Sequence, residues 1–162
     1  MRSRVQALAF FVKEKPVDGG PGSCYGASMS SIKPALVHTI LCDDVRQEVG
    51  GKFSLMGLFE AIFSASFPAV HPRFAVVNEW KGGKGEFTAM TRLLTPDRTT
   101  VMAESSAKIT LYSETQRHRD ITIRFNTSFA VPGTYWLEML LDGERAGLVP
   151  LQVQQVNQQT VH

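Results

Sequence analysis

The stretch VMAESSAKITL, Val101–Leu111, alternates apolar and polar residues with a period of two. Successive side chains of a β-strand point to opposite faces, so this period separates an apolar face from a polar one. The apolar set is Val101, Ala103, Ala107, Ile109 and Leu111, and the polar set is Glu104, Ser106, Lys108 and Thr110. Half-buried antiparallel strands have this pattern, so the stretch predicts a strand with one face in a core.

The segments on either side repeat the pattern, with turn residues at the spacing typical of all-β sandwiches and barrels. We expect strands at 35–42, 52–59, 73–80, 86–94, 101–111, 118–125, 131–141 and 147–153. KGGKG (81–85), TPDRT (95–99) and Asp142-Gly143 are expected turns. No segment has a helical period over about ten residues. The sequence therefore predicts an all-β, antiparallel β-sandwich of seven or eight strands.

Alternation also assigns an inward face to most of these strands. The residues expected in the core are Phe74, Val76, Trp80, Phe87, Ala89, Thr91, Leu93, Ile121, Ile123, Phe125, Tyr135, Leu137, Met139 and Leu141. Pro150 cannot donate a backbone hydrogen bond, so it indicates an edge position for the last strand.

The chain of 162 residues fits one domain with extensions. We expect a disordered N-terminal extension at 1–32, a sandwich domain at 33–154 and a polar tail at 155–162. The N-terminus MRSRVQALAFFVKEKP weakly resembles a signal peptide but has no small-x-small cleavage site. No window approaches the length of apolar sequence that a membrane helix needs, so no membrane partner is expected.

The net charge of +2 comes from residues 1–28, where four basic residues stand against two acidic ones. The remainder is neutral and lacks the basic footprint of a nucleic-acid binder. Two cysteines, Cys24 and Cys42, are too few for a disulfide framework in a chain of this size. We expect both to be reduced thiols in a cytoplasmic protein.

The segment LCDDVRQEVGGK places Cys42 beside Asp43 and Asp44 and ahead of a Gly-Gly turn. A cysteine nucleophile needs a base or a cation that favours the thiolate, whereas adjacent carboxylates raise the thiol pKa. We therefore expect Cys42 to be a small buried hydrophobe, with the two aspartates starting the turn and Arg46 pairing with either of them. No Ser-His-Asp order or paired-carboxylate site is evident, and the chain is not expected to be an enzyme.

A zinc site is not expected either. His38 and Cys42 share one face of a strand but lie about 13 Å apart at about 3.3 Å per residue. KGGKGE (81–86) lacks the phosphate-loop pattern and no helix follows it. No cofactor is therefore predicted. Calcium stays open as an alternative, because Asp43, Asp44, Asp97 and Asp142 all fall in expected turns that a sandwich can gather at one end.

Trp136 and Leu140 fall on the face opposite the inward residues of their strand. If that face meets water, the two side chains indicate a partner surface. If the strand is central and covered on both sides, they are core residues. The pattern does not choose between these two interpretations.

The ordered set of motifs resembles a family of small bacterial proteins that have no assigned function. The matching pieces are CDDVR (Cys42–Arg46), GKFSLMGLF (Gly51–Phe59), FPAVHPRFAVV (Phe67–Val77), RLLTPD (Arg92–Asp97), PGTYWLEMLLDGE (Pro132–Glu144) and PLQV (Pro150–Val153). The resemblance implies a single immunoglobulin-like β-sandwich and supplies no catalytic residues. It also implies that CDDVR and the following turn form a corner that joins two strands.

The function predicted from the sequence is a non-enzymatic protein-binding or assembly module. It would bind a protein partner or self-associate through an edge strand or the Trp136 face. The candidate partner-facing residues are Asp43, Asp44, Arg46, Trp136 and Leu140. The alternative is a sandwich that binds a small ligand or calcium through its loop aspartates.

Overall fold

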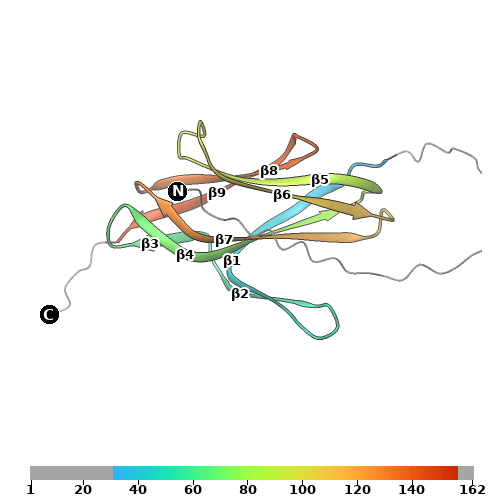
Figure 1. Ribbon diagram of the computed structural model, residues 1–162, viewed down its shortest axis with the longest axis horizontal. Helices are drawn as coiled ribbons and strands as arrows, with labels where there is room; N and C mark the ends of the chain where they lie inside the picture. Colours follow the sequence, from blue (N-terminus) through green and yellow to red (C-terminus); the bar gives the residue numbers. More distant parts are fainter. Residues whose placement is uncertain (1–30, 157–162) are drawn as a thin grey trace, which may run out of the picture.

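A computed structural model describes residues 31–156 of the chain (Figure 1). Within this range the protein is all-β and has two layers of strands. The predictions for residues 1–30, for Cys24 and for 157–162 lie outside the described residues. The described range contains no helix that could span a membrane.

The described residues form nine strands rather than the predicted seven or eight. They are β1 (Ala35–Gln47), β2 (Phe53–Leu58), β3 (Ala61–Ser64), β4 (Ala69–Lys81), β5 (Gly85–Leu94), β6 (Val101–Leu111), β7 (Arg117–Phe129), β8 (Gly133–Leu141) and β9 (Glu144–Gln155). The additional strand is β3, which is separated from β2 by Phe59 and Glu60. Ahead of β1, Ile32 forms an isolated backbone bridge with Lys84.

The strands divide into a four-stranded sheet, with order β2-β1-β4-β7, and a five-stranded sheet, with order β3-β9-β8-β5-β6. The first sheet is antiparallel throughout. The second is mixed, because β3 pairs with β9 in parallel, so the expected antiparallel arrangement is wrong for β3. The reason is the break after β2, which carries the chain from one sheet to the edge of the other. The immunoglobulin-like topology stays a prediction.

The main core lies between the two sheets. Its buried members include the predicted inward residues Phe74, Val76, Trp80, Phe87, Ala89, Leu93, Tyr135, Leu137, Met139 and Leu141. Period-two alternation is therefore confirmed for β4, β5 and β8. At the β8–β9 turn, Asp142 and Gly143 both have positive φ, as a two-residue type I′ turn requires.

The predicted orientation of β7 is wrong. Ile121 and Ile123 pack on the outer face of the four-stranded sheet, and Phe125 lies there beside Arg73. The alternate residues face the interior, where Asp120 bonds with Asn78 and Trp80, Thr122 with Ser105, and Arg124 with Thr91. Polar residues face inward because strands β4, β5 and β6 supply these partners.

The predicted corner at CDDVR is also wrong. Asp43 and Asp44 lie inside β1, which continues to Gln47, and the chain reverses only at 48–51. Gly50 and Gly51 have positive φ there, so the glycine pair alone makes the turn. The second half of β1 pairs with β2, and this hairpin extends away from the two layers (Figure 1).

Candidate functional site

The outer face of the four-stranded sheet carries an apolar cluster of its own, which we call the apolar band. Its central residues are Ile40, Cys42, Ala75, Val77, Ile121 and Ile123. All of them come from β1, β4 and β7. The register pairs Met56 with Asp44 and Leu58 with Cys42, so these two side chains of β2 lie on the same face as the band. Leu58 is 64% exposed, and Met56 and Phe125 are exposed as well. The margin of the band therefore presents apolar side chains to the surroundings, while Cys42, Ala75 and Val77 at its centre are buried.

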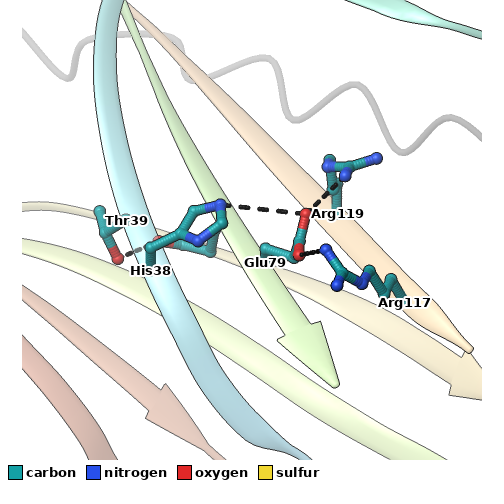
Figure 2. A network of polar contacts seen from close by, with 6 residues as sticks. His38, Thr39, Glu79, Arg117 and Arg119 are labelled. Atoms are coloured by element: carbon teal, nitrogen blue, oxygen red, sulfur yellow. Dashed lines mark hydrogen bonds and ion pairs between the residues drawn. The ribbon is translucent and has the colours of Figure 1, made fainter. Parts of the chain in front are cut away.

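One end of the band is formed by Glu79 and three basic side chains (Figure 2). Glu79 Oε1 accepts a hydrogen bond from Arg117 Nη1 at 2.9 Å, and Oε2 lies 2.5 Å from Arg119 Nη2. His38 Nε2 lies 3.9 Å from Oε2 on the side facing β1. The register explains this convergence, because His38, Glu79 and Arg119 lie opposite one another on three adjacent strands.

The Glu79 side chain is buried, whereas its arginine partners are exposed. Its side chain is 2% exposed, whereas those of Arg117 and Arg119 are 54% and 44% exposed. Burial acts to raise the pKa of Glu79, but the charges of Arg119, Arg117 and His38 outweigh it and leave the pKa below its ordinary value. Glu79 is thus a buried carboxylate in its ionised form, paired with arginine side chains that reach the surface.

The opposite end of the band has a similar arrangement around Asp44. Arg73 Nη1 lies 2.6 Å from Asp44 Oδ1, and Arg46 Nε donates to Oδ2 at 3.3 Å. The Arg73 guanidinium also lies 5.9 Å from the centre of the Phe125 ring. Hydrogen bonding to Arg73, above all, holds the pKa of Asp44 below its ordinary value. The predicted pairing of Arg46 with an aspartate is confirmed.

Cys42 lies in the band between these two ends and is fully buried. Burial raises the pKa of its thiol, and Asp43 and Asp44 raise it further. The electrostatic effect expected from the sequence is therefore present. A thiol with these neighbours favours its protonated form, which makes it a packing residue in the band.

The other candidate residues lie elsewhere. Asp43 is exposed, and its carboxylate occupies the space that a side chain at Gly57 would need. On the outer face of the five-stranded sheet, Trp136 is half-buried, with the Arg98 guanidinium 3.6 Å from a ring centre. Leu140, on the same strand, is only 6% exposed. Because β8 lies between β9 and β5, the central-strand interpretation describes Leu140 better than the partner-surface one.

The aspartates proposed for calcium do not converge. Asp97 accepts hydrogen bonds from Thr95 and Thr99 within its own turn, and Asp142 accepts one from the Thr88 amide at 2.7 Å. Asp44 is held by arginines on β1 and β4. Between residues 31 and 156, no group of three or more histidine, cysteine, aspartate or glutamate side chains is placed to hold a metal ion.

A second polar cluster lies on the inner face, between the sheets. Asn78 donates to Thr91 and to Asp120, both at 2.9 Å, and accepts from Thr39 at 2.8 Å. Trp80 Nε1 donates to the other Asp120 oxygen at 2.6 Å. Burial raises the pKa of Asp120 in spite of these two donors.

Arg124, on the same strand as Asp120, is buried, and burial lowers its pKa to about 10. Its Nη2 donates to the Thr91 carbonyl, while its Nε and Nη1 have no hydrogen-bond partner among the described residues. The buried guanidinium therefore has only part of its hydrogen-bonding capacity satisfied.

Sequence reasoning missed Glu79, Arg73, Arg117 and Arg119 as a set. A signal was present in FAVVNEW (74–80), where Ala75, Val77 and Glu79 form an alternate face beside the predicted inward one. That face contains two small apolar residues and one acid, so the strand is suited to burial on both sides.

Residues 38–154 match the model of a family described as "Family of unknown function (DUF6941)". The match covers most of the chain, and the protein belongs to this family. It runs from His38, near the start of β1, to Gln154, one residue before the end of β9. No curated protein matches the chain.

Proposed function

We propose that this chain, a member of a family without an assigned activity, is a non-enzymatic module that binds a protein segment on the apolar band. The observation that carries the proposal is a hydrophobic cluster built on the outer face of a single sheet. Exposed apolar residues lie at its margin, and two groups of arginines lie at its ends. Contiguous apolar surface rimmed by polar residues is typical of interaction sites.

The composition of this face supports the same conclusion. Aromatic residues, methionine and arginine are enriched at protein interfaces relative to other surfaces. Here Phe125 and Met56 border the band, and Arg46 and Arg117 extend beyond it with more than half of each side chain exposed. The Trp136 face has less support, because Leu140 is buried and Arg98 covers the Trp136 ring.

We also propose that the topology is immunoglobulin-like. In that fold the strands called C, F and G are neighbours in one sheet, and B and E are neighbours in the other. The orders β5-β8-β9 and β4-β7 fit this scheme. Tyr135, near the start of the strand in the F position, donates its hydroxyl to the Val131 carbonyl at 2.9 Å, as in a tyrosine corner.

A cytoplasmic location and the absence of enzymatic activity belong to this proposal as well. The supporting observation for both is Cys42, a free buried cysteine whose raised thiol pKa does not favour catalysis. The alternative ligand or calcium function has no comparable support, because the aspartates are held by separate local partners.

The test is a quantitative pull-down from lysate of the native host, followed by mass spectrometry. The bait is the full chain, compared with Ile121→Gln/Ile123→Gln on the band and with Met90→Gln/Leu148→Gln on the outer face of the five-stranded sheet. All four residues are half-buried and apolar, so the two variants are matched in chemistry. Thermal unfolding checks that both remain folded.

We expect a protein captured by the unchanged chain to be lost from the band variant and retained by the control. Equal capture by all three baits would contradict the proposal, and so would loss from the control alone.

A further inference from the structure

We infer that the segment bound by the apolar band carries acidic residues on both sides of an apolar stretch. This inference rests on the proposed function and names the chemistry of the partner. It follows from the charges at the two ends of the band, which repeat one arrangement. At each end, two arginines share a single carboxylate: Arg117 and Arg119 share Glu79, and Arg46 and Arg73 share Asp44.

Each of these groups therefore carries one more positive charge than negative. Both carboxylates have a pKa below the ordinary value, so both are ionised at neutral pH and each cancels one guanidinium. The surplus charge lies on exposed groups, since Arg46, Arg117 and Arg119 are all at least 44% exposed. Lys81 is exposed two positions beyond Glu79 on β4 and adds to the positive charge of that end.

The arginines also retain hydrogen-bonding capacity for a ligand. A guanidinium has several N–H donors in a planar fork that matches a carboxylate. Arg117 uses Nη1 for Glu79 and Arg46 uses Nε for Asp44. Within residues 31–156 these two side chains make no other hydrogen bond, so their remaining N–H groups can pair with a carboxylate of a partner.

The spacing sets the length of the bound segment. Arg73 and Glu79 lie on the same face of β4, and the six residue steps from one to the other span about 20 Å at about 3.3 Å per residue. Ala75 and Val77 lie between them. An extended segment would place its acidic residues about six positions apart, and a helical one about thirteen, at about 1.5 Å per residue.

A second copy of this chain fits the band less well. Stacking two identical faces would bring the positively charged ends of one copy onto those of the other. Juxtaposed like charges oppose association. An acidic and apolar partner has no such penalty, which is why we assign the band to a different chain.

The test is selection of random 16-residue peptides displayed on phage against the full chain at low salt. A second selection uses Arg46→Gln/Arg117→Gln, which removes the surplus charge at both ends. That variant leaves Arg73 on Asp44 and Arg119 on Glu79, so neither carboxylate loses both partners. A third selection uses Ile121→Gln/Ile123→Gln as the variant without an intact band.

On the unchanged chain we expect enrichment of peptides with apolar residues between two acidic positions. The Arg46→Gln/Arg117→Gln pool should keep the apolar centre and lose the acidic flanks. The best acid-flanked peptide, measured by fluorescence anisotropy, should bind about tenfold more tightly than its lysine-flanked analogue, and the difference should shrink as salt is added.

The other outcomes separate the two proposals. An apolar pool without acidic flanks, or acidic flanks that persist on Arg46→Gln/Arg117→Gln, would overturn the inference and leave the band as a binding site. The same pool on the unchanged chain and on Ile121→Gln/Ile123→Gln, or no enrichment on either, would overturn the proposed function itself.

Discussion

The two faces of the four-stranded sheet bury acidic residues in opposite ways. Glu79 on β4 and Asp120 on β7 belong to neighbouring register pairs, Glu79 with Arg119 and Asn78 with Asp120, but they point to opposite sides of the sheet. Glu79 is held by charged arginines that are themselves exposed, and its pKa falls. Asp120 is held by neutral donors in the interior, and burial raises its pKa in spite of them.

The difference shows that the nature of the partners, and not burial alone, sets the state of a carboxylate. On the outer face, ion pairs keep a charge at the end of an apolar surface where a partner can reach it. On the inner face, Asn78 and Trp80 direct their donors at Asp120 and fix the register of β4 against β7. Three predictions test this contrast.

The largest effect is expected for Asp120→Ala. The substitution leaves Trp80 Nε1 and one Asn78 amide proton without acceptors between the sheets, and each unsatisfied buried donor costs about 1–3 kcal/mol. We expect the free energy of unfolding to fall by about 3 kcal/mol, measured by urea denaturation with tryptophan fluorescence.

The matched variant on the outer face is Arg119→Ala. Arg117 and water remain available to Glu79, so the loss should be about 1 kcal/mol. If Arg119→Ala costs as much as Asp120→Ala, the Glu79 end is a structural centre comparable to the interior network, and the contrast fails.

The second prediction concerns pH. Glu79 has a folded pKa below 4.5, so it contributes stability that is present above 4.5 and is lost as pH falls through the folded value. Asp120 has a folded pKa above 3.8, so the native state binds its proton more tightly and loses stability as pH rises from 3.8 through the folded value.

Urea unfolding between pH 3 and 6 should therefore separate Glu79→Gln from Asp120→Asn. As pH rises, Glu79→Gln should become less stable relative to the unchanged protein, and Asp120→Asn should become more stable relative to it. Constant offsets from altered hydrogen bonds do not affect these slopes. Slopes of the same sign for both variants would show that the two carboxylates do not differ as described.

Much of the fold follows from alternation in the sequence, and the exception is instructive. The inward faces of β4, β5 and β8 were predictable because one face of each is almost entirely apolar. On β7 the apolar residues Ile121 and Ile123 lie on the outer face, and Asp120, Thr122 and Arg124 lie inside. Their partners come from β4, β5 and β6, and such long-range contacts leave no mark on the local sequence.

The candidate site could be predicted only in part, for the same reason. Asp44 and Arg46 are two residues apart, so their pairing follows from the local sequence. Arg73 and Phe125 meet them through the register of three strands, and Glu79 meets Arg117 and Arg119 in the same way. The corner predicted at Asp43 and Asp44 failed because the glycine pair that follows makes the turn without them.

The smallest effect is expected for Arg124→Met. The Arg124 guanidinium is buried, and its Nε and Nη1 find no partner among the described residues, so the charge loses hydration without full compensation. Methionine has a similar length and no charge, and replacing buried ionic groups by apolar residues of similar volume is often neutral or stabilising. We expect the free energy of unfolding to change by less than about 1 kcal/mol, or to increase, in the same urea assay. Among the described residues, the substitution removes one hydrogen bond, the one to the Thr91 carbonyl. A decrease of about 3 kcal/mol, the size expected for Asp120→Ala, would mean that the guanidinium is fully compensated inside the protein and belongs to the interior network as an equal member.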